Sequence, residues 1–265
     1  MIRIEPYSNL WRRLARRTSG GALAVAAWLL LPVAGARADV PSWMQAAATQ
    51  PLPAYPADTD AVLLLDEQVT TVKDSGEIDT VYRRVFKILR TEGKRFGTVS
   101  VYFDSETRLT YLKGWAIAGD GERYEVKEKE AIETSPFADF LYQDTRLKLL
   151  VIPAANPGNV IGYEYQQRRR PYVLEDSWAF QREIPTRSSR FSLHVPGSWE
   201  IKPYWINREP IDGHTNRPQE WSWRIENVPA IPDEPAMPPW ESLAGRMLVS
   251  FFPTGGGRRG MVFKS

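Results

Sequence analysis

Residues Tyr142–Pro171 read YQDTRLKLLVIPAANPGNVIGYEYQQRRRP, and this stretch predicts a strand, a turn and a second strand. The first strand is the apolar run Leu147–Ile152. Pro157 and Gly158 then break the pattern, because proline fixes φ and glycine readily takes a positive φ. Apolar and polar residues alternate in Ile161–Gln166, which is the period-two pattern of a strand with one buried face. The stretch contains no catalytic motif, so it predicts a fold and says nothing of chemistry.

The same pattern of strands and turns extends to both sides of this stretch. Gly76, and later Asp120 with Gly121, stand between apolar runs and predict tight hairpins. We expect Trp199–Ile206 and Glu220–Val228 to pair with each other. The other expected strands are Val62–Val72, Ile78–Leu89, Gly97–Phe103, Arg108–Ala118, Arg123–Val126, Pro171–Arg182, Phe191–Val195 and Met247–Phe252. About ten short strands without a helical period are typical of an all-β sandwich of antiparallel strands.

Two proline-rich segments are expected to lie outside the strands. Residues 39–59 predict an exposed lead-in with one helical turn near Trp43–Ala48. Five prolines fall between Pro229 and Pro239, and they exclude a central strand because proline has no N–H to donate. We expect this second segment to be extended and to pack on the surface of a sheet.

The N-terminus has the layout of a secretory signal. Trp11–Arg17 is basic, Ala22–Val33 is apolar, and Ala36 and Ala38 are small residues at the positions that a signal peptidase reads. We therefore expect a signal peptide at residues 1–38 and export, most simply to the periplasm. The alternative is an uncleaved helical membrane anchor, although the apolar run is shorter than the ~20 residues that a span needs.

Composition excludes several kinds of chemistry. The 265 residues contain no cysteine, which removes thiolate nucleophiles, disulfides and cysteine metal sites. No G-x-S-x-G elbow is present, and the two histidines, His194 and His214, are too few to predict a metal site. The formal net charge is only +2, so we expect no nucleic-acid partner. No phosphate-binding glycine loop occurs either, and we expect no catalytic residue, cofactor or metal.

Two groups of residues are candidates for a binding surface. Tryptophan is abundant, with 10 residues, and aromatic faces stack on sugars or peptides. Trp199 and Trp205 are the residues we select, with a tryptophan-rich core as the alternative. The run Arg168, Arg169 and Arg170 is the second group, and a solvated strand end is its alternative reading.

The order of the turn and core motifs resembles the DUF3857 family, an exported bacterial domain found in front of transglutaminase-like domains. The resemblance covers residues 60–253 and rests on the D-S-G turn at 74–76, V-F-K-I-L at 85–89, W-A-I-A-G-D-G at 115–121, Asp144 with Arg146 and Leu147, P-G-N-V-I-G-Y-E-Y at 157–165, Pro185, Pro196 and D-E-P-A-M-P at 233–238. It implies an immunoglobulin-like β-sandwich in the cell envelope, with residues 254–265 as a flexible exit.

In longer relatives of that family a papain-like Cys–His–Asp domain follows the sandwich. Without cysteine, no residue of this sequence can take over the nucleophile's role. The resemblance therefore implies a non-catalytic module that supports a transglutaminase-like domain, either on the same chain, which would then be truncated here, or on a separate protein. One alternative is a module that binds an envelope glycan, peptidoglycan or a peptide through exposed tryptophan. The least favoured is a hydrolase with paired carboxylates, for which the sequence names no pair.

Overall fold

The protein forms one large and two small β-sheets, as seen in a computed structural model that describes residues 38–135, 144–232 and 234–254. The strands of the large sheet, in spatial order, are β12 (His214–Arg217), β13 (Glu220–Val228), β10 (Thr186–His194), β1 (Ala61–Val72), β2 (Ile78–Ile88), β8 (Val160–Arg169), β4 (Thr107–Ile117) and β5 (Arg123–Lys127). Neighbours pair antiparallel except β1 and β10, which are parallel.

Each small sheet has three strands. The first is formed by β3 (Thr98–Phe103), β7 (Arg146–Val151) and β6 (Ile132–Thr134), and the second by β11 (Trp199–Ile206), β14 (Arg246–Pro253) and β9 (Glu175–Ala179). The helices are short: α1 (Ser42–Ala48), α2 (Trp240–Leu243) and the 3-10 helices η1 (Thr91–Gly97) and η2 (Glu128–Glu130). The described residues are therefore mainly β, as the sequence predicts, and no helix among them is long and apolar enough to cross a bilayer.

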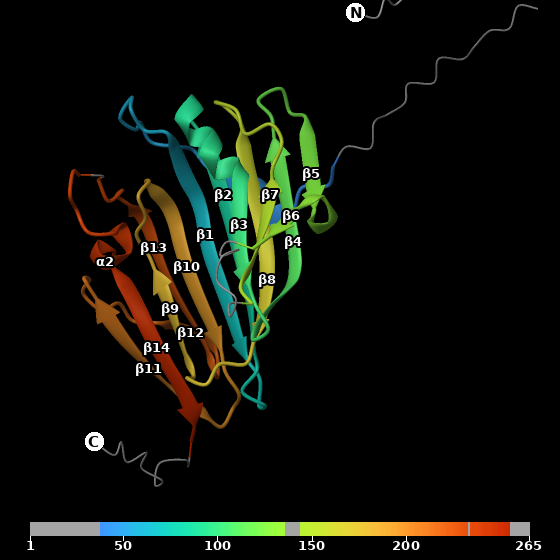
Figure 1. Cartoon of the computed structure of the whole chain (residues 1–265). Coiled ribbons are helices and arrows are strands. Elements are labelled where there is room, and N and C mark those ends of the chain that lie inside the picture. Colours follow the sequence, from blue (N-terminus) through green and yellow to red (C-terminus); the bar gives the residue numbers. More distant parts are fainter. Residues whose placement is uncertain (1–37, 136–143, 233, 255–265) are drawn as a thin grey trace, which may run out of the picture. The chain divides into compact units, whose positions relative to one another are not determined.

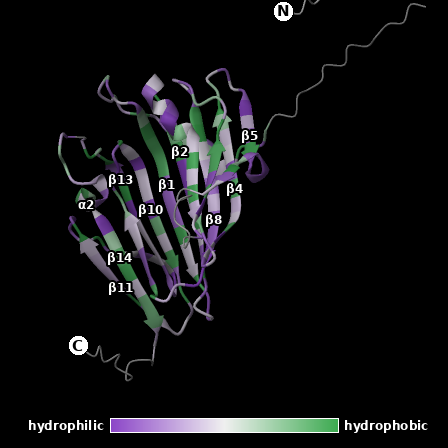
Figure 2. Ribbon diagram, viewed as in Figure 1, coloured by the Kyte–Doolittle hydropathy of each residue, from purple (hydrophilic) through white to green (hydrophobic). Residues whose placement is uncertain are grey.

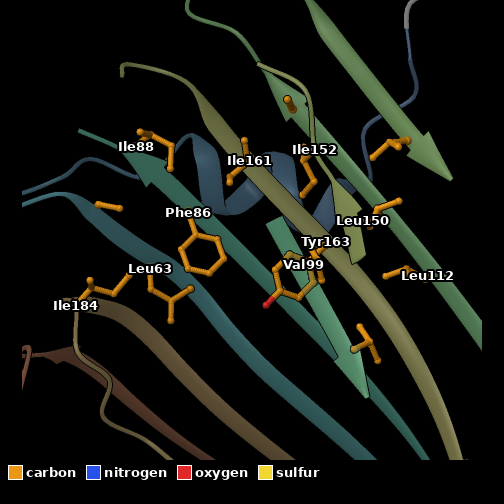
Figure 3. Packing of buried hydrophobic residues seen from close by; sticks show 14 residues of the cluster. Leu63, Phe86, Ile88, Val99, Leu112, Leu150, Ile152, Ile161, Tyr163 and Ile184 are labelled. Carbon is orange, nitrogen blue, oxygen red and sulfur yellow. The ribbon is translucent and has the colours of Figure 1, made fainter. Parts of the chain in front are cut away.

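Both small sheets pack on the same side of the large sheet and enclose two separate cores (Figure 1). In the first core, Phe86 and Tyr163 of the large sheet pack near Val99 of β3, and Figure 3 shows these side chains together. In the second core, Phe191 of β10 packs with Met247 of β14. The arrangement confirms the predicted sandwich, with one broad layer facing two narrower ones.

Helix α1 covers part of the opposite face of the large sheet. Its Met44 is completely buried, and it packs with Val62 of β1 and Val85 of β2. The lead-in was expected to be exposed, and here it is partly buried. The alternation of β1 places Leu63 on one face of the large sheet and Val62 on the other, so apolar side chains on both faces must be buried by packed elements. Figure 2 shows the resulting mixture of hydrophobic and hydrophilic residues along the strands.

The local turns are correct, but some of the expected strand pairings are wrong. β1 pairs with β2 and β4 with β5, as predicted. However, β11 pairs with β14, while β13 pairs with β10. The strands that residues 142–171 predict, β7 and β8, were also expected to form a pair, but they belong to different sheets. Turn residues specify only local reversals, whereas these pairings join strands far apart in the chain.

The turn between β7 and β8 connects the two layers. Gly158 has a φ of +87°, which is the conformation that its sequence position predicts, and its N–H donates to the carbonyl oxygen of Ile88 at 2.9 Å. Asn159 accepts a hydrogen bond from the N–H of Gly119 at 2.9 Å, beside the Asp120–Gly121 turn. Gly121 also has a positive φ, of +86°. Both predicted turns therefore lie at the same end of the large sheet.

Candidate ligand-binding site

A buried carboxylate lies on the large sheet at the junction of the two cores. Asp66 of β1 is completely buried, and each of its oxygens accepts a hydrogen bond from an arginine. Arg84 of β2 donates from Nε to Oδ1 at 2.8 Å, and Arg182, which follows β9, donates from Nε to Oδ2 at 2.6 Å. Arg84 also donates from Nη1 to the hydroxyl of Tyr163 at 3.1 Å. The sheet register places Asp66, Arg84 and Tyr163 side by side on three adjacent strands.

Arg182 contacts two tryptophan rings. Its guanidinium carbon is 5.1 Å from the ring centroid of Trp178 and 5.3 Å from that of Trp240. Trp178 is buried on β9 and is itself held by a hydrogen bond from Nε1 to Ser189 at 3.1 Å. Cation–π contacts of this kind are stronger when the cation is removed from water. The guanidinium of Arg182 is therefore held by Asp66 at one nitrogen and by contacts with two aromatic rings.

A cavity of about 280 Å³ borders this centre, between η1 with β3 on one side and the Arg182–Ile184 segment with α2 on the other. Arg84, Arg182 and Tyr163 line it together with apolar side chains such as Phe86 and Phe96. The cavity thus combines a few convergent polar groups with apolar walls, which is the usual composition of a small-molecule site.

The charges of the centre are strongly coupled. Burial alone would raise the pKa of Asp66, but the charges of Arg182 and Arg84 outweigh it, so that the pKa is lowered and the carboxylate stays ionised. Burial also lowers the pKa of Arg182, with the nearby charge of Arg84 acting in the same direction and Asp66 opposing both. One carboxylate therefore faces two guanidinium groups in a largely desolvated position.

A second group of buried polar side chains extends the centre along β1. Gln68 and Thr70, which share a face with Asp66, donate hydrogen bonds to Oδ2 of Asp176 on β9 at 2.8 and 2.6 Å. Arg169 of β8 forms an ion pair with the same carboxylate, at 3.2 Å between its Nη2 and Oδ1. These contacts fasten the second small sheet to the large sheet, and we assign them a structural role.

A wider groove adjoins the cavity. Its volume is about 1050 Å³, and it lies between residues 53–60 of the lead-in and the proline-rich residues 227–232. Arg95, Glu183 and Ile184 line both the groove and the cavity. The proline-rich segment is anchored by the N–H of Ile231, which donates to the carbonyl oxygen of Arg182 at 2.9 Å. The groove therefore opens beside the group formed by Asp66, Arg84 and Arg182, which we call the arginine centre.

The predicted arginine run lies at the end of β8 and is already paired. Arg168 contacts Asp79 with 2.7 Å between Nε and Oδ1, and Arg170 contacts Glu77 with 3.4 Å between Nε and Oε2. Arg169 pairs with Asp176, as described above. Since every arginine of the run has an acidic partner, the structure favours a solvated strand end over a surface for polyanions.

The two selected tryptophans do not form an open surface. Trp199 is only 6% exposed and packs against Phe251 in the second core, which corrects its choice as an exposed binding residue. Trp205 is half-buried and stacks on Phe180, with 5.4 Å between ring centroids. The period-two alternation of the strand predicts which residues share a face, but not that this face is covered by another sheet.

Sequence reasoning missed the arginine centre. Asp66, Gln68 and Thr70 stand at alternating positions directly after the apolar run of β1, so they continue one face of a central strand. A carboxylate on a buried strand face requires a partner, and that is the signal available in the sequence. Its partners, Arg84 and Arg182, come from distant segments and could not be identified without the sheet order.

No group of three His, Asp or Glu side chains within the described part of the chain is arranged to hold a metal ion. Ala36 lies outside the described residues, and so does the rest of the predicted signal sequence up to residue 37.

The fold and the buried centre define a β-sandwich domain with a small internal cavity. The family model of DUF3857, a domain of unknown function with a solved structure, matches residues 74–232, which is more than half of the chain. The chain therefore belongs to the DUF3857 family, as the sequence motifs predict.

Solved structures give the fold a wider context. A Parabacteroides distasonis protein described as a candidate protease has a TM-score of 0.65 and 16% identity, over 73% of this chain and 41% of that one. Yeast LTA4 hydrolase with bestatin has a TM-score of 0.34 and 12% identity, over 79% and 33% of the two chains. An M1 zinc metallopeptidase from Deinococcus radiodurans has a TM-score of 0.35 and 10% identity, over 72% of this chain and 42% of that one.

Only the first of these structures supports an argument, and at its low identity the likeness shows the fold alone. This chain spans about two-fifths of the length of that protein. A comparison with the curated proteins finds no match.

Proposed function

We propose that this chain is a non-catalytic, exported β-sandwich module that accompanies a transglutaminase-like, papain-like domain. The observation that carries the proposal is the likeness to a longer protein described as a candidate protease, of which this fold accounts for 41%. Membership of the DUF3857 family supports it. In this account the module contributes a folded surface and a ligand cavity, while its partner contributes the nucleophile.

The sequence composition supports the non-catalytic part of the proposal. A papain-like mechanism needs a thiolate, and this chain has no cysteine to supply one. The buried Asp66 is held between two arginines, and a lowered pKa makes it a poor proton acceptor near neutral pH. Asp66 is therefore better suited to hold the two arginines in place than to transfer a proton.

Export is proposed from the N-terminal residues alone. The basic segment, the apolar run and the small residues ending at Ala38 predict secretion, and the cell envelope, most simply the periplasm, is the proposed location. Exported proteins are often stabilised by disulfides, which a chain without cysteine cannot form. Its stability would therefore depend on packing and on the buried ion pairs.

A turnover assay on the purified chain tests the proposal. We expect no amide hydrolysis of casein, no transfer of a fluorescent amine to a glutamine peptide, and no cleavage of peptidoglycan fragments above a buffer control. A papain-like enzyme and a transglutaminase run in parallel show that the assays detect such activities. Turnover that rises in proportion to the concentration of the chain, and persists after a second purification step, would contradict a non-catalytic role.

A further inference from the structure

We propose that the cavity of about 280 Å³ beside Asp66 binds a carboxylate group through Arg182 and Arg84. The ligand is an organic acid about the size of one amino-acid residue, either free or as the carboxyl end of a peptide. This inference stands on the cavity and its arginines, and it does not depend on the partner proposed above.

The first argument is charge. Asp66 is the only acidic side chain that pairs with either arginine in the described residues, so one negative charge serves two positive charges. The side chains of Arg84 and Arg182 are only 28% and 16% exposed. The pair of arginines therefore leaves a net positive charge beside the cavity, and a second carboxylate would complement it.

The second argument is the free donors. Arg182 uses Nε for Asp66, and its two Nη nitrogens make no hydrogen bond to the described residues. Nη2 of Arg84 is likewise without a partner among them. Guanidinium groups bind carboxylates through paired N–H donors in a planar fork. Because Arg182 contacts both Trp178 and Trp240 and is bound to Asp66, its guanidinium is already oriented before a ligand arrives.

The third argument is the size and lining of the cavity. A volume of about 280 Å³ is slightly below the ~300 Å³ of the smallest usual ligand sites, so it suits one residue-sized group. Phe86, Phe96 and Trp240 provide apolar walls for a side chain attached to the acid. Glu183 is the acidic residue of the lining, and it is exposed at the rim and forms no ion pair with the described residues. Its charge would oppose an anionic ligand without blocking the arginines.

Calorimetric titration tests the proposal with matched ligand pairs. N-acetyl-L-leucine is compared with its uncharged amide, and the tripeptide N-acetyl-Ala-Ala-Leu with its own amide, at millimolar concentrations. We expect heat of binding from at least one free acid and none from the corresponding amide. Binding of the small acid alone would identify a free organic acid, and binding of the tripeptide acid would identify a peptide end. Equal binding of acid and amide, or binding of neither acid, would overturn the proposal.

Variants assign the binding to the cavity. Arg182→Gln should weaken acid binding by about tenfold or more, since it removes a charge-assisted contact. Because this change also disturbs Asp66, Trp240→Ala provides a second variant that leaves the Asp66 pairs intact and should weaken binding by about threefold to tenfold. Glu183→Gln should tighten binding of the acid, because it removes a negative charge from the cavity lining. Arg108→Gln is the control, an exposed arginine with no ion pair in the described residues, and it should bind like the wild type. Unchanged affinity in both folded cavity variants would contradict the assignment.

Discussion

Replacing Asp66 by alanine is expected to lower the free energy of unfolding by about 3–5 kcal/mol, because it leaves two buried guanidinium groups without their shared carboxylate. Both contacts are short, at 2.8 and 2.6 Å, and Asp66 has no exposed surface. The measurement is urea unfolding followed by tryptophan fluorescence. The control is Asp79→Ala, which removes a partly exposed carboxylate from its surface pairs with Arg168 and Lys73 and should cost about 0–1 kcal/mol. Equal losses in the two variants would contradict the role given to the centre.

The same centre predicts a dependence of stability on pH. The pKa of Asp66 is lower in the folded chain than in the unfolded chain, so its contribution is complete above the unfolded value of about 3.9. That contribution is lost as the pH falls from there through the lower folded pKa. Acid should therefore destabilise the wild type more than Asp66→Ala. Parallel loss of stability in the two proteins over this range would contradict a lowered pKa of Asp66 in the folded state.

Replacing Phe191 by alanine is expected to cost about 3–5 kcal/mol, since the side chain is completely buried and its removal leaves a cavity. Phe191 stacks near Trp178 and Trp223, with ring centroids 6.4 and 5.7 Å apart, and it therefore holds the second small sheet to the large one. We expect a lower urea midpoint and a weaker near-ultraviolet dichroism signal from the tryptophans. Phe252→Ala provides the matched control, because Phe252 is 42% exposed and should cost much less. A loss below about 1 kcal/mol for Phe191→Ala would contradict the proposed second core.

The sequence predicted the local features of the fold because they depend on neighbouring residues. The alternation in β8 and the glycines at 121 and 158 specify strands and turns over a few positions. The short strands β6 and β12 were missed, because three or four residues carry too little periodicity to distinguish a strand from a loop.

The candidate site could not be predicted in the same way. It joins Asp66, Arg84 and Arg182, which are brought together by the order of the strands and by the small sheet that covers them. The same reason explains the error over Trp199, whose face is hidden by packing between sheets. Residues that seemed chemically unremarkable in the sequence therefore form the centre of the cavity.

The pairing with a transglutaminase-like domain is tested most directly by reading the genomic DNA past the codon of Ser265, together with the intact mass of the native product. The account predicts a segment that encodes Cys, then His, then Asp, either in the continuing frame or in a neighbouring gene. A native mass that matches Asp39–Ser265, with no such segment nearby, would contradict the pairing and leave a module that acts alone.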